Sequence, residues 1–513
     1  MATSLYPQIY DKFLGIREYN GVNSNGIISA IKANNIDLYQ SDIGSGIGIK
    51  STKGNKGIYE LPEGYKIIDI FSSQQDKTIY DFIYAENDTK GTLFYANPIN
   101  NATIIIDDLP LSAKANGLTM TSSAYDVFIF TNGKKQYSVC FSKAEKVKEI
   151  NAVDFLGRNI SWLAMWEWNG FLVVSSEYGV HASHQNDIYT WNDNPQDKAD
   201  SWYIDFSKKV TAIVGFSAGL FIFTDSDVTR LLGNPNTSNS SLELVSMNGT
   251  LSYQSIAIHD TYLFFYDPKQ KNIYYMQITD TGQTRPSGPV AKEVQSYFNK
   301  SISKFKMCSC IYSGNNEIWC LIDDKILIYD YTKQEWLRRT EQNINCVCLS
   351  DNQVLTGGDS GIVYLEKINN DFNEQFFPSE YRTTFINMGS NSNLKKQKTP
   401  LLICLNDNEL NDFWVELTVN NKQKNPKRVK ITVSCEAVYG NSNDVNVIPK
   451  NETYEHAYYA ADNPYSKRII EISTPQTWYT LGIRFYTDQA GQGFAINSIE
   501  LKNVKAKTKT KGR

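Results

Sequence analysis

The chain has 513 residues, of which 41% are hydrophobic and 21% are charged, and its formal net charge is -4. This length exceeds what one hydrophobic core usually serves, so we expect two or three domains. The mildly acidic balance excludes nucleic-acid binding through a general basic surface, but not a lumen through which DNA passes. The 32 Tyr and 24 Phe favour β-structure.

Residues 1–21 contain no apolar stretch of the kind found in signal peptides. No run in the sequence has the apolar length of a membrane span. We therefore expect synthesis in a cytosol, no membrane insertion and no need for disulfides.

Residues 1–57 are rich in Asn and Gly and contain few strong strand patterns. Residues 25–39 can pair as an extended strand, and residues 41–57 form a polar, Gly-rich connection. We interpret residues 1–57 as a lead-in or platform segment that docks on another structure rather than a domain of its own.

Residues 58–367 repeat a plan of short apolar strands separated by tight turns, with a period of about 40–50 residues. We predict a β-propeller of about seven blades, with six and eight as alternatives. The meanders are Ile67–Phe71, Tyr80–Tyr84 and Thr92–Tyr95; Leu118–Thr121, Tyr125–Gly133 and Gln136–Phe141; two within residues 162–233; Gln254–Ile258, Tyr262–Tyr266 and Asn272–Met276; Ser309–Tyr312, Glu317–Ile322, Lys325–Tyr331 and Glu335–Leu337; and Asn345–Leu349, Gln353–Gly358 and Gly361–Leu365.

The two meanders within residues 162–233 have the clearest pattern. Asn169-Gly170 and Ala218-Gly219 are expected to supply the positive φ angles that hairpin turns require. The continuous apolar runs Phe171–Val174 and Leu220–Phe223 predict strands buried on both faces. An insertion in the fifth repeat predicts a short helix at Val290–Phe298. Because a single blade leaves its faces uncovered, several must stack into a ring.

Residues 368–501 change character, with period-two alternation that is typical of strands with one buried face. We predict a β-sandwich platform-type domain there. Residues 502–513 form a basic tail without apolar support, which we expect to be disordered. The sandwich strands are expected at Tyr381–Gly389, Leu401–Leu405, Phe413–Val419, Arg428–Cys435, Lys467–Ser473, Trp478–Tyr486 and Phe494–Leu501.

Two cysteine pairs are candidates for a four-thiolate zinc site, since alternate side chains share one face of a strand. They are Cys308 with Cys310 and Cys346 with Cys348. Structural zinc motifs usually place Cys-x-x-Cys in a turn, however, whereas both pairs lie within predicted strands. Buried, unreactive thiols are the favoured interpretation.

Acid–base chemistry has few candidates, because the chain contains four His. His181 and His184 follow a strand, in a spacing that fits no helix-borne zinc motif, so we interpret them as part of a polar loop. The pairs Asp107-Asp108 and Asp323-Asp324 lie at turns, where Asp usually serves the backbone. We predict no enzymatic activity, no cofactor and no metal.

Basic residues near the C-terminal end are candidates for contact with DNA or an acidic partner, although solvation is the simpler interpretation. They are Lys395, Lys396, Lys398, Lys502, Lys505, Lys507, Lys509, Lys511 and Arg513.

Four pieces of the chain resemble the tail nozzle proteins of short-tailed bacteriophages, also described as phage stabilisation or tail tubular B proteins. They are Ala33–Leu38 with the Gly-rich stretch to Gly57, Phe171–Ser176 with the polar run to Trp202, Val210–Leu231, and Tyr381–Ser390. These are packing patterns rather than catalytic signatures.

The resemblance implies a structural virion protein of the phage tail. It implies a hexameric ring below the portal and adaptor, in contact with other tail proteins, through which DNA passes on its way out. A glycan- or receptor-binding propeller on the virion surface is the alternative, favoured if Trp191, Trp202 or Tyr203 lines an open pocket. A propeller glycosidase is a third hypothesis, which needs carboxylates converging near the central channel.

Overall fold

The chain divides into two compact units in the computed structural model. Residues 55–369 form one unit, and residues 1–54 together with 370–513 form the other. Among the described residues, no helix is long and apolar enough to cross a membrane. The structure describes the whole chain except residues 1, 5–7, 19–22, 25, 42–45, 98–100, 122–125, 155, 192–196, 217–218, 280–282, 313–314, 341–342, 370–377, 389–392, 398, 407–411, 421–425, 432–437, 440–445, 448–468, 476, 490–491 and 508–513.

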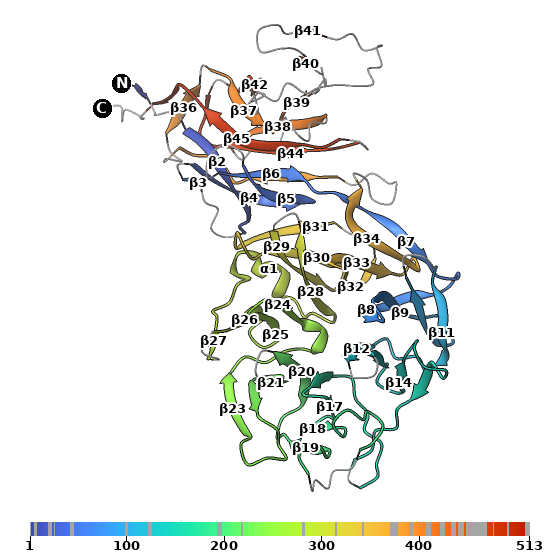
Figure 1. Cartoon of the computed structure of the whole chain (residues 1–513). Helices are drawn as coiled ribbons and strands as arrows, with labels where there is room; N and C mark the ends of the chain where they lie inside the picture. The colour runs from blue at the N-terminus through green and yellow to red at the C-terminus, as the bar shows by residue number, and fades with distance from the viewer. Residues whose placement is uncertain are drawn as a thin grey trace. The chain divides into compact units, whose positions relative to one another are not determined.

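The described part of residues 55–369 forms seven four-stranded antiparallel arrangements, named blades 1–7 below. Figure 1 shows them following one another around a ring. The inner strands of blades 7 and 1 contact each other, so the ring closes. The strands are β8 (Lys66–Gln75), β9 (Thr78–Glu86), β10 (Gly91–Ala96) and β11 (Thr103–Leu109) in blade 1; β12 (Asn116–Thr121), β13 (Asp126–Thr131), β14 (Gln136–Val139) and β15 (Val147–Glu149) in blade 2; β16 (Met165–Trp168), β17 (Phe171–Ser175), β18 (Gly179–Ala182) and β19 (Trp202–Asp205) in blade 3; β20 (Val210–Phe216), β21 (Gly219–Thr224), β22 (Val228–Leu232) and β23 (Ser241–Ser246) in blade 4; β24 (Ile256–His259), β25 (Tyr262–Asp267), β26 (Asn272–Ile278) and β27 (Thr284–Pro286) in blade 5; β28 (Phe305–Tyr312), β29 (Asn315–Ile322), β30 (Lys325–Asp330) and β31 (Glu335–Arg339) in blade 6; and β32 (Ile344–Ser350), β33 (Gln353–Gly358), β34 (Ile362–Asn369) and β7 (Gly54–Glu60) in blade 7.

Blade 7 joins the two ends of the propeller. Its first three strands come from the end of the repeat region, whereas its outermost strand, β7, precedes blade 1 in sequence. Pairing between β34 and β7 therefore fastens the ring across about 300 residues of chain, a contact that local sequence patterns do not reveal. This arrangement, seven antiparallel sheets in a closed ring, is that of a β-propeller.

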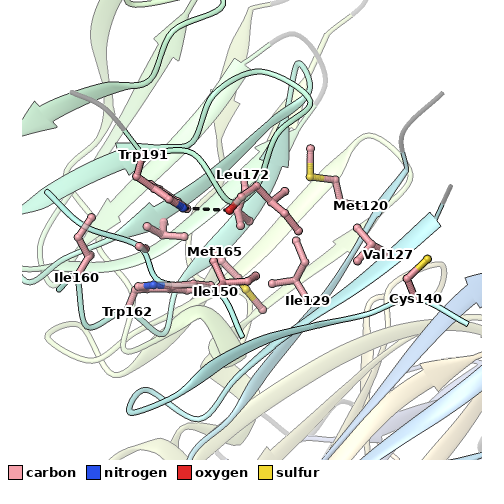
Figure 2. Packing of buried hydrophobic residues seen from close by; sticks show 13 residues of the cluster. Met120, Val127, Ile129, Cys140, Ile150, Ile160, Trp162, Met165, Leu172 and Trp191 are labelled. Carbon is pink, nitrogen blue, oxygen red and sulfur yellow. Dashed lines mark hydrogen bonds between the residues drawn. The ribbon is translucent and has the colours of Figure 1, made fainter. Parts of the chain in front are cut away.

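The propeller core is divided into clusters that each lie between neighbouring blades. One cluster combines Val127 and Ile129 of blade 2 with Met165, Leu172 and Val174 of blade 3. Figure 2 shows how two tryptophans, Trp162 and Trp191, extend this cluster. Burying one such aliphatic side chain contributes about 1.5–3 kcal/mol, and neither blade provides that burial alone. The interblade clusters are thus the physical reason that the sheets close into a ring.

Local sequence explains the hairpins of blades 3 and 4. Asn169 and Gly170 have φ angles of 54° and 82°, as predicted for a turn that needs two left-handed residues. The equivalent turn of blade 4 differs from the prediction, because Gly219 already belongs to β21 and has no positive φ, and Ala218 lies outside the described residues. Strands β17 and β21 are buried along their whole length, which confirms the prediction from their continuous apolar runs.

The predicted short helix of the fifth repeat is confirmed over residues 292–298. It consists of the 3-10 turn η2 (Lys292–Val294) followed by α1 (Gln295–Phe298). Val294 and Phe298 are its buried residues, and the Phe298 ring lies 6.3 Å from the Trp336 ring of blade 6. The helix therefore covers part of the side of blade 6.

The second unit is built from strands of both chain ends. Strand β4 pairs in parallel with β2 and antiparallel with β35, and β45 pairs with β2, β6 and β37. Its strands are β1 (Ala2–Ser4), β2 (Gln8–Ile16), β3 (Asn23–Ser24), β4 (Gly26–Asn34), β5 (Ile36–Gln40), β6 (Ile47–Ser51), β35 (Glu380–Thr383), β36 (Leu394–Gln397), β37 (Leu401–Leu405), β38 (Phe413–Val419), β39 (Lys427–Ile431), β40 (Val438–Tyr439), β41 (Asn446–Val447), β42 (Ile469–Ile472), β43 (Thr477–Trp478), β44 (Leu481–Tyr486), β45 (Ala495–Leu501) and β46 (Val504–Lys507).

Residues 1–54 do not form a domain of their own, since this discontinuous unit combines them with residues 370–513. Phe13 is fully buried and its ring contacts that of Tyr381, whose hydroxyl donates to the Leu14 carbonyl at 2.8 Å. The sequence of this segment looks irregular because it is rich in Asn and Gly and because β4 has one partner, β35, more than 340 residues away. The β-sandwich predicted for residues 368–501 remains a prediction.

Candidate functional site

The predicted basic contact residues are not grouped on one free surface. Lys395 is fully buried on β36, where its Nζ donates to the Tyr479 carbonyl at 2.9 Å and lies 5.9 Å from the centre of the Trp478 ring. Burial lowers the pKa of Lys395. The interpretation of this lysine as a solvated contact residue is therefore wrong, because strand pairing turns its side chain inwards.

The expected disordered tail is also corrected for its first residues. Val504–Lys507 is strand β46, which pairs with β1 and β36, and Val504 and Ala506 are buried. Lys505 lies directly across from Lys396 on β36. Lys502 is partly exposed and forms a 3.0 Å ion pair with Glu500.

The remaining predicted contact residues are only partly described. Lys507 pairs through its backbone with Ala2 and Leu394. Lys398, Lys509, Lys511 and Arg513 lie outside the described residues.

Three of the four cysteines in the two pairs have the burial expected of unreactive thiols, and Cys348 is partly buried. Cys308 and Cys310 are buried on β28 and Cys346 on β32, and the described cysteines are free thiols. Burial raises the pKa of the Cys346 thiol to about 12 and also raises the pKa of Cys308 and Cys320. Within the described part of the chain, no three His, Cys, Asp or Glu side chains are arranged to hold a metal ion.

We expect Cys308, Cys320 and Cys346 to resist alkylation by iodoacetamide at pH 8 in the native protein. Burial blocks access, and the raised pKa keeps each thiol protonated and so weakly nucleophilic. Peptide mass spectrometry should find these sites modified only after unfolding in guanidinium chloride. Modification of native Cys346 as fast as a free thiol would contradict the buried assignment.

The histidine loop is held by ordinary polar contacts. His181 is buried on β18, stacks against the Tyr203 ring at 6.0 Å, and its Nε2 lies 3.2 Å from the Ser176 hydroxyl. His184 Nδ1 lies 3.8 Å from an Asp200 carboxylate oxygen. Thr190 donates to Asp187 at 2.7 Å. These contacts orient the loop.

The aromatic residues named for a glycan pocket do not form one. Trp191 and Trp202 are buried, and the Trp191 indole N–H donates to the Ile188 carbonyl at 3.0 Å. Tyr203 is 37% exposed and stacks on His181 rather than lining either of the two channel cavities described below.

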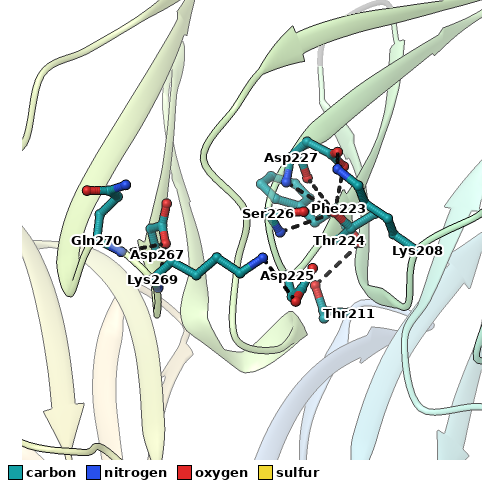
Figure 3. A network of polar contacts seen from close by, with 10 residues as sticks. All are labelled: Lys208, Thr211, Phe223, Thr224, Asp225, Ser226, Asp227, Asp267, Lys269 and Gln270. Carbon is teal, nitrogen blue, oxygen red and sulfur yellow. Dashed lines mark hydrogen bonds and ion pairs between the residues drawn. The ribbon is translucent and has the colours of Figure 1, made fainter.

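The prediction that paired Asp residues lie at turns and bind backbone holds for Asp323 but is wrong for Asp107 and Asp108. Both belong to strand β11, and Asp107 forms an ion pair with Lys90 and accepts from the Thr92 hydroxyl at 2.9 Å. Asp323 accepts from the Ser303 and Lys304 amides at 3.0 and 3.1 Å. Figure 3 shows the same use of Asp267 in blade 5, which accepts the Lys269 and Gln270 amides at 2.7 and 3.0 Å. These carboxylates stabilise hairpins and do not converge on a common point.

A chamber lies where the inner strands of the propeller begin, and we name it the basic chamber. Its volume is about 810 Å³. Residues from all seven blades, or from segments leading into them, line it, from Ile68 of blade 1 to Asn345 of blade 7. A cavity bounded by every blade lies on the axis of the ring, which is the region in which propellers offer a ready-made pocket.

Four lysines line the basic chamber: Lys114, Lys209, Lys304 and Lys306. The described lining includes one carboxylate, Glu177, which lies 3.6 Å from Lys209 in an exposed ion pair. Such exposed pairs contribute little, because water screens both charges. The chamber is therefore positive although the chain as a whole is acidic.

Lys306 differs from the other three lysines because a buried carboxylate neutralises its charge. It is 6% exposed, forms a 3.0 Å ion pair with Asp69 and donates to the Ile68 carbonyl at 2.8 Å. The Gln254 amide also donates to Asp69. Burial raises the pKa of Asp69, while Lys306 opposes that rise. This buried carboxylate is thus committed to Lys306 and Gln254, and carboxylates do not converge here as a glycosidase requires.

A second cavity follows the first along the inner strands. Its volume is about 240 Å³, and residues such as Met165, Ile213 and Met307 make its lining apolar. Tyr253 lines both cavities and therefore lies between them. Its hydroxyl is buried without a hydrogen-bond partner among the described residues, although the Gln254 side chain lies beside it.

The sequence interpretation missed the lysines of the basic chamber, although a signal was present. Lys114, Lys209 and Lys304 recur at intervals of 95 residues. Each stands one or two residues before the inner strand of blade 2, 4 or 6. The interval corresponds to two blades, so knowledge of the blade boundaries was needed to recognise that these side chains meet.

No protein-family model matches the chain, and no curated protein matches it. Similar solved structures include the computationally designed Ika8 protein, at 12% identity and a TM-score of 0.37, covering 61% of this chain and 100% of that one. BBS1N in complex with ARL6DN matches at 11% identity and a TM-score of 0.40, covering 63% and 99%. The N-terminal domain of Nup159 matches at 10% identity and a TM-score of 0.39, covering 65% and 97%. The assignment of the fold rests on the sheet topology itself.

Proposed function

We propose that the chain is a structural component of a bacteriophage tail, a nozzle whose copies form a ring around the path of the exiting DNA. The proposal assigns the chain no catalysis and no cofactor. The nozzle role and the number of six copies come from the sequence resemblance.

The observation that carries the proposal is the insertion of the propeller into a unit built from both chain ends. Two of the four pieces that resemble nozzle proteins, the opening segment and the start of the final domain, are paired here. Ala33 of β4 lies directly across from Tyr381 of β35. This contact, which the sequence does not reveal, supports the resemblance. A platform built from both chain ends, with a propeller inserted between them, contains all four of the pieces that resemble nozzle proteins.

We further propose that the discontinuous unit is a β-sandwich. Phe494, which precedes β45, contacts Phe413 of β38 and Phe485 of β44, with ring centres 5.7 and 6.0 Å apart. Strands β38 and β44 pair with each other, whereas β45 pairs elsewhere. Packing of Phe494 against this pair is the contact expected between two sheet faces.

Assembly of a ring requires two different complementary surfaces on each copy, because identical chains close a ring through head-to-tail interfaces. Exposed apolar side chains are available on the propeller. Leu242, Leu244 and Met247, on and after the outer strand of blade 4, are 50%, 58% and 74% exposed. An exposed apolar edge strand is a site for association with another chain.

The positive charge on the small sheet that contains β36 and β46 supports a contact between this sheet and an acidic protein of the virion. Lys396 and Lys505 are direct cross-strand neighbours there. Like charges in this position repel each other, and a carboxylate of a partner relieves the repulsion.

Native mass spectrometry of the purified chain, alone and with candidate adaptor proteins, tests the proposal. We expect a closed ring, six copies by resemblance, at least when the adaptor is bound. Replacing Leu244 with Asp should shift the population towards monomer, because a charge then enters a desolvated interface. Leu156→Asp is the matched control, since Leu156 is 61% exposed outside this patch.

A chain that stays monomeric with every virion partner, and that binds cell-surface glycans on an array, would overturn the nozzle in favour of the receptor-binding alternative.

A further inference from the structure

We propose that the basic chamber of the propeller binds a small molecule carrying two or more phosphate groups, with Lys114, Lys209 and Lys304 as its contact residues. The three lysines reach the chamber from the segments that lead into blades 2, 4 and 6. Positive charge therefore enters from three separate parts of the rim. A molecule with several phosphates fits this arrangement better than a single ion does, because it can contact more than one lysine at once.

Within the part of the chain that the structure describes, no buried carboxylate neutralises these three lysines. Lys114 and Lys304 form no ion pair among the described residues, and Lys209 has only the exposed 3.6 Å pair with Glu177. Lys304 Nζ instead donates to the Asn345 side-chain oxygen at 2.7 Å. A bound phosphate supplies the anion that these side chains lack.

The electrostatics of Lys304 point the same way. Burial, followed by repulsion from Lys306, lowers the pKa of Lys304 to about 8, while Cys346, Asp69 and Asp359 act in the opposite direction. A nearby phosphate stabilises the charged form, so binding should raise this pKa. The protein holds a cation in partial burial at the chamber wall, which is costly unless an anion compensates it.

The size of the chamber is a second and independent observation. Its volume of about 810 Å³ lies within the range of small-molecule sites.

Isothermal titration calorimetry of the full-length protein with sodium tripolyphosphate tests the proposal, with citrate as a carboxylate of similar charge. We expect saturable binding at one site per chain, and tighter binding of tripolyphosphate than of citrate. Lys304→Met, Lys114→Met and Lys209→Met should each weaken the binding about tenfold, from the usual strength of charged hydrogen bonds.

Lys77→Met is the matched control for loss of one positive charge. Lys77 is an exposed lysine in the turn after β8, at the opposite end of that strand from the chamber residue Ile68. We expect its affinity to equal that of the unmodified protein. An equal loss in Lys77→Met and Lys114→Met, or unchanged affinity in both Lys114→Met and Lys304→Met, would overturn the site, as would an absence of binding to either probe.

The pH dependence of tripolyphosphate binding is a further test, because a lysine with a purely structural role would not change it. Because the Lys304 ammonium binds and has a pKa of about 8 when free, affinity should fall as pH rises through 8 to 9. In Lys304→Met this fall should disappear, whereas in Lys77→Met it should remain. A pH profile that is identical in all three proteins would contradict the role of Lys304. None of these outcomes depends on the ring assembly.

Discussion

Replacing Glu366 with Gln is expected to destabilise the propeller by about 3–5 kcal/mol, because it leaves the Arg339 guanidinium buried without its counter-charge. The two side chains are each 1% exposed and lie 2.6 Å apart, one on β34 of blade 7 and the other on β31 of blade 6. Thr356 and Asn55 also donate to Glu366, at 2.6 and 3.2 Å. Four strands of the two blades therefore meet at one carboxylate.

A second buried pair lies beside the first and increases the expected effect. Lys367 and Glu317 are 2.6 Å apart and almost completely buried. Both cations lie near the Trp319 ring, Arg339 at 5.6 Å and Lys367 at 5.8 Å from its centre. Loss of the negative charge at Glu366 leaves two neighbouring cations to share Glu317 and one aromatic ring.

Equilibrium unfolding in urea measures the effect. The free energies of unfolding of the variant and the unmodified protein are compared with the same dependence on urea concentration. Glu149→Gln is the control, because Glu149 forms an exposed ion pair with Lys135 at 2.6 Å and should change the stability by less than about 1 kcal/mol. Equal effects of the two substitutions would show that the buried network between blades 6 and 7 contributes no more than a surface pair.

The sequence predicted the second strands of blades 3 and 4 better than the outer strands of the propeller. Strands such as β17 and β21 are apolar throughout, and tight turns such as Asn169-Gly170 mark their ends. The outer strands β15, β23 and β27 are largely exposed, so no apolar alternation distinguishes them from loops. Their pairing is determined by the neighbouring strand rather than by their own residues.

Long-range pairing also limited the prediction of the sites. Lys395 looks like a solvated residue in sequence, but Trp478, which covers it, lies 83 residues further along the chain. Lys304 and Asn345 likewise meet only because two blades are neighbours. Charge and residue type are local properties, whereas burial and contact depend on which strands are paired.

Replacing Tyr59 with Ala is expected to weaken the closure of the ring, with a loss of stability of about 3–5 kcal/mol. Tyr59 lies on β7, the strand that completes blade 7, and is 8% exposed in a cluster with Ile67 of blade 1 and Leu355 of blade 7. Its hydroxyl donates to Asp81 of blade 1 at 3.2 Å, and Ser350 of blade 7 donates to the same carboxylate at 2.6 Å. The side chain thus links the strand that closes the ring to both blades that meet there.

Hydrogen exchange distinguishes loss of closure from a general loss of core packing. In Tyr59→Ala, the amides of β7 and β34 should exchange faster than those of blades 3 and 4. Phe171→Ala removes a fully buried ring between blades 3 and 4, so it should lower the stability by a similar amount. In this variant, however, the amides of blades 3 and 4 should exchange faster than those of β7 and β34. Tyr59→Phe keeps the ring but removes one donor to Asp81, and should cost about 1.5 kcal/mol. If amide exchange became faster to the same extent in all blades of both alanine variants, β7 would not be the strand that closes the ring. A ring that β7 closes should open first at the contact between β7 and its neighbours.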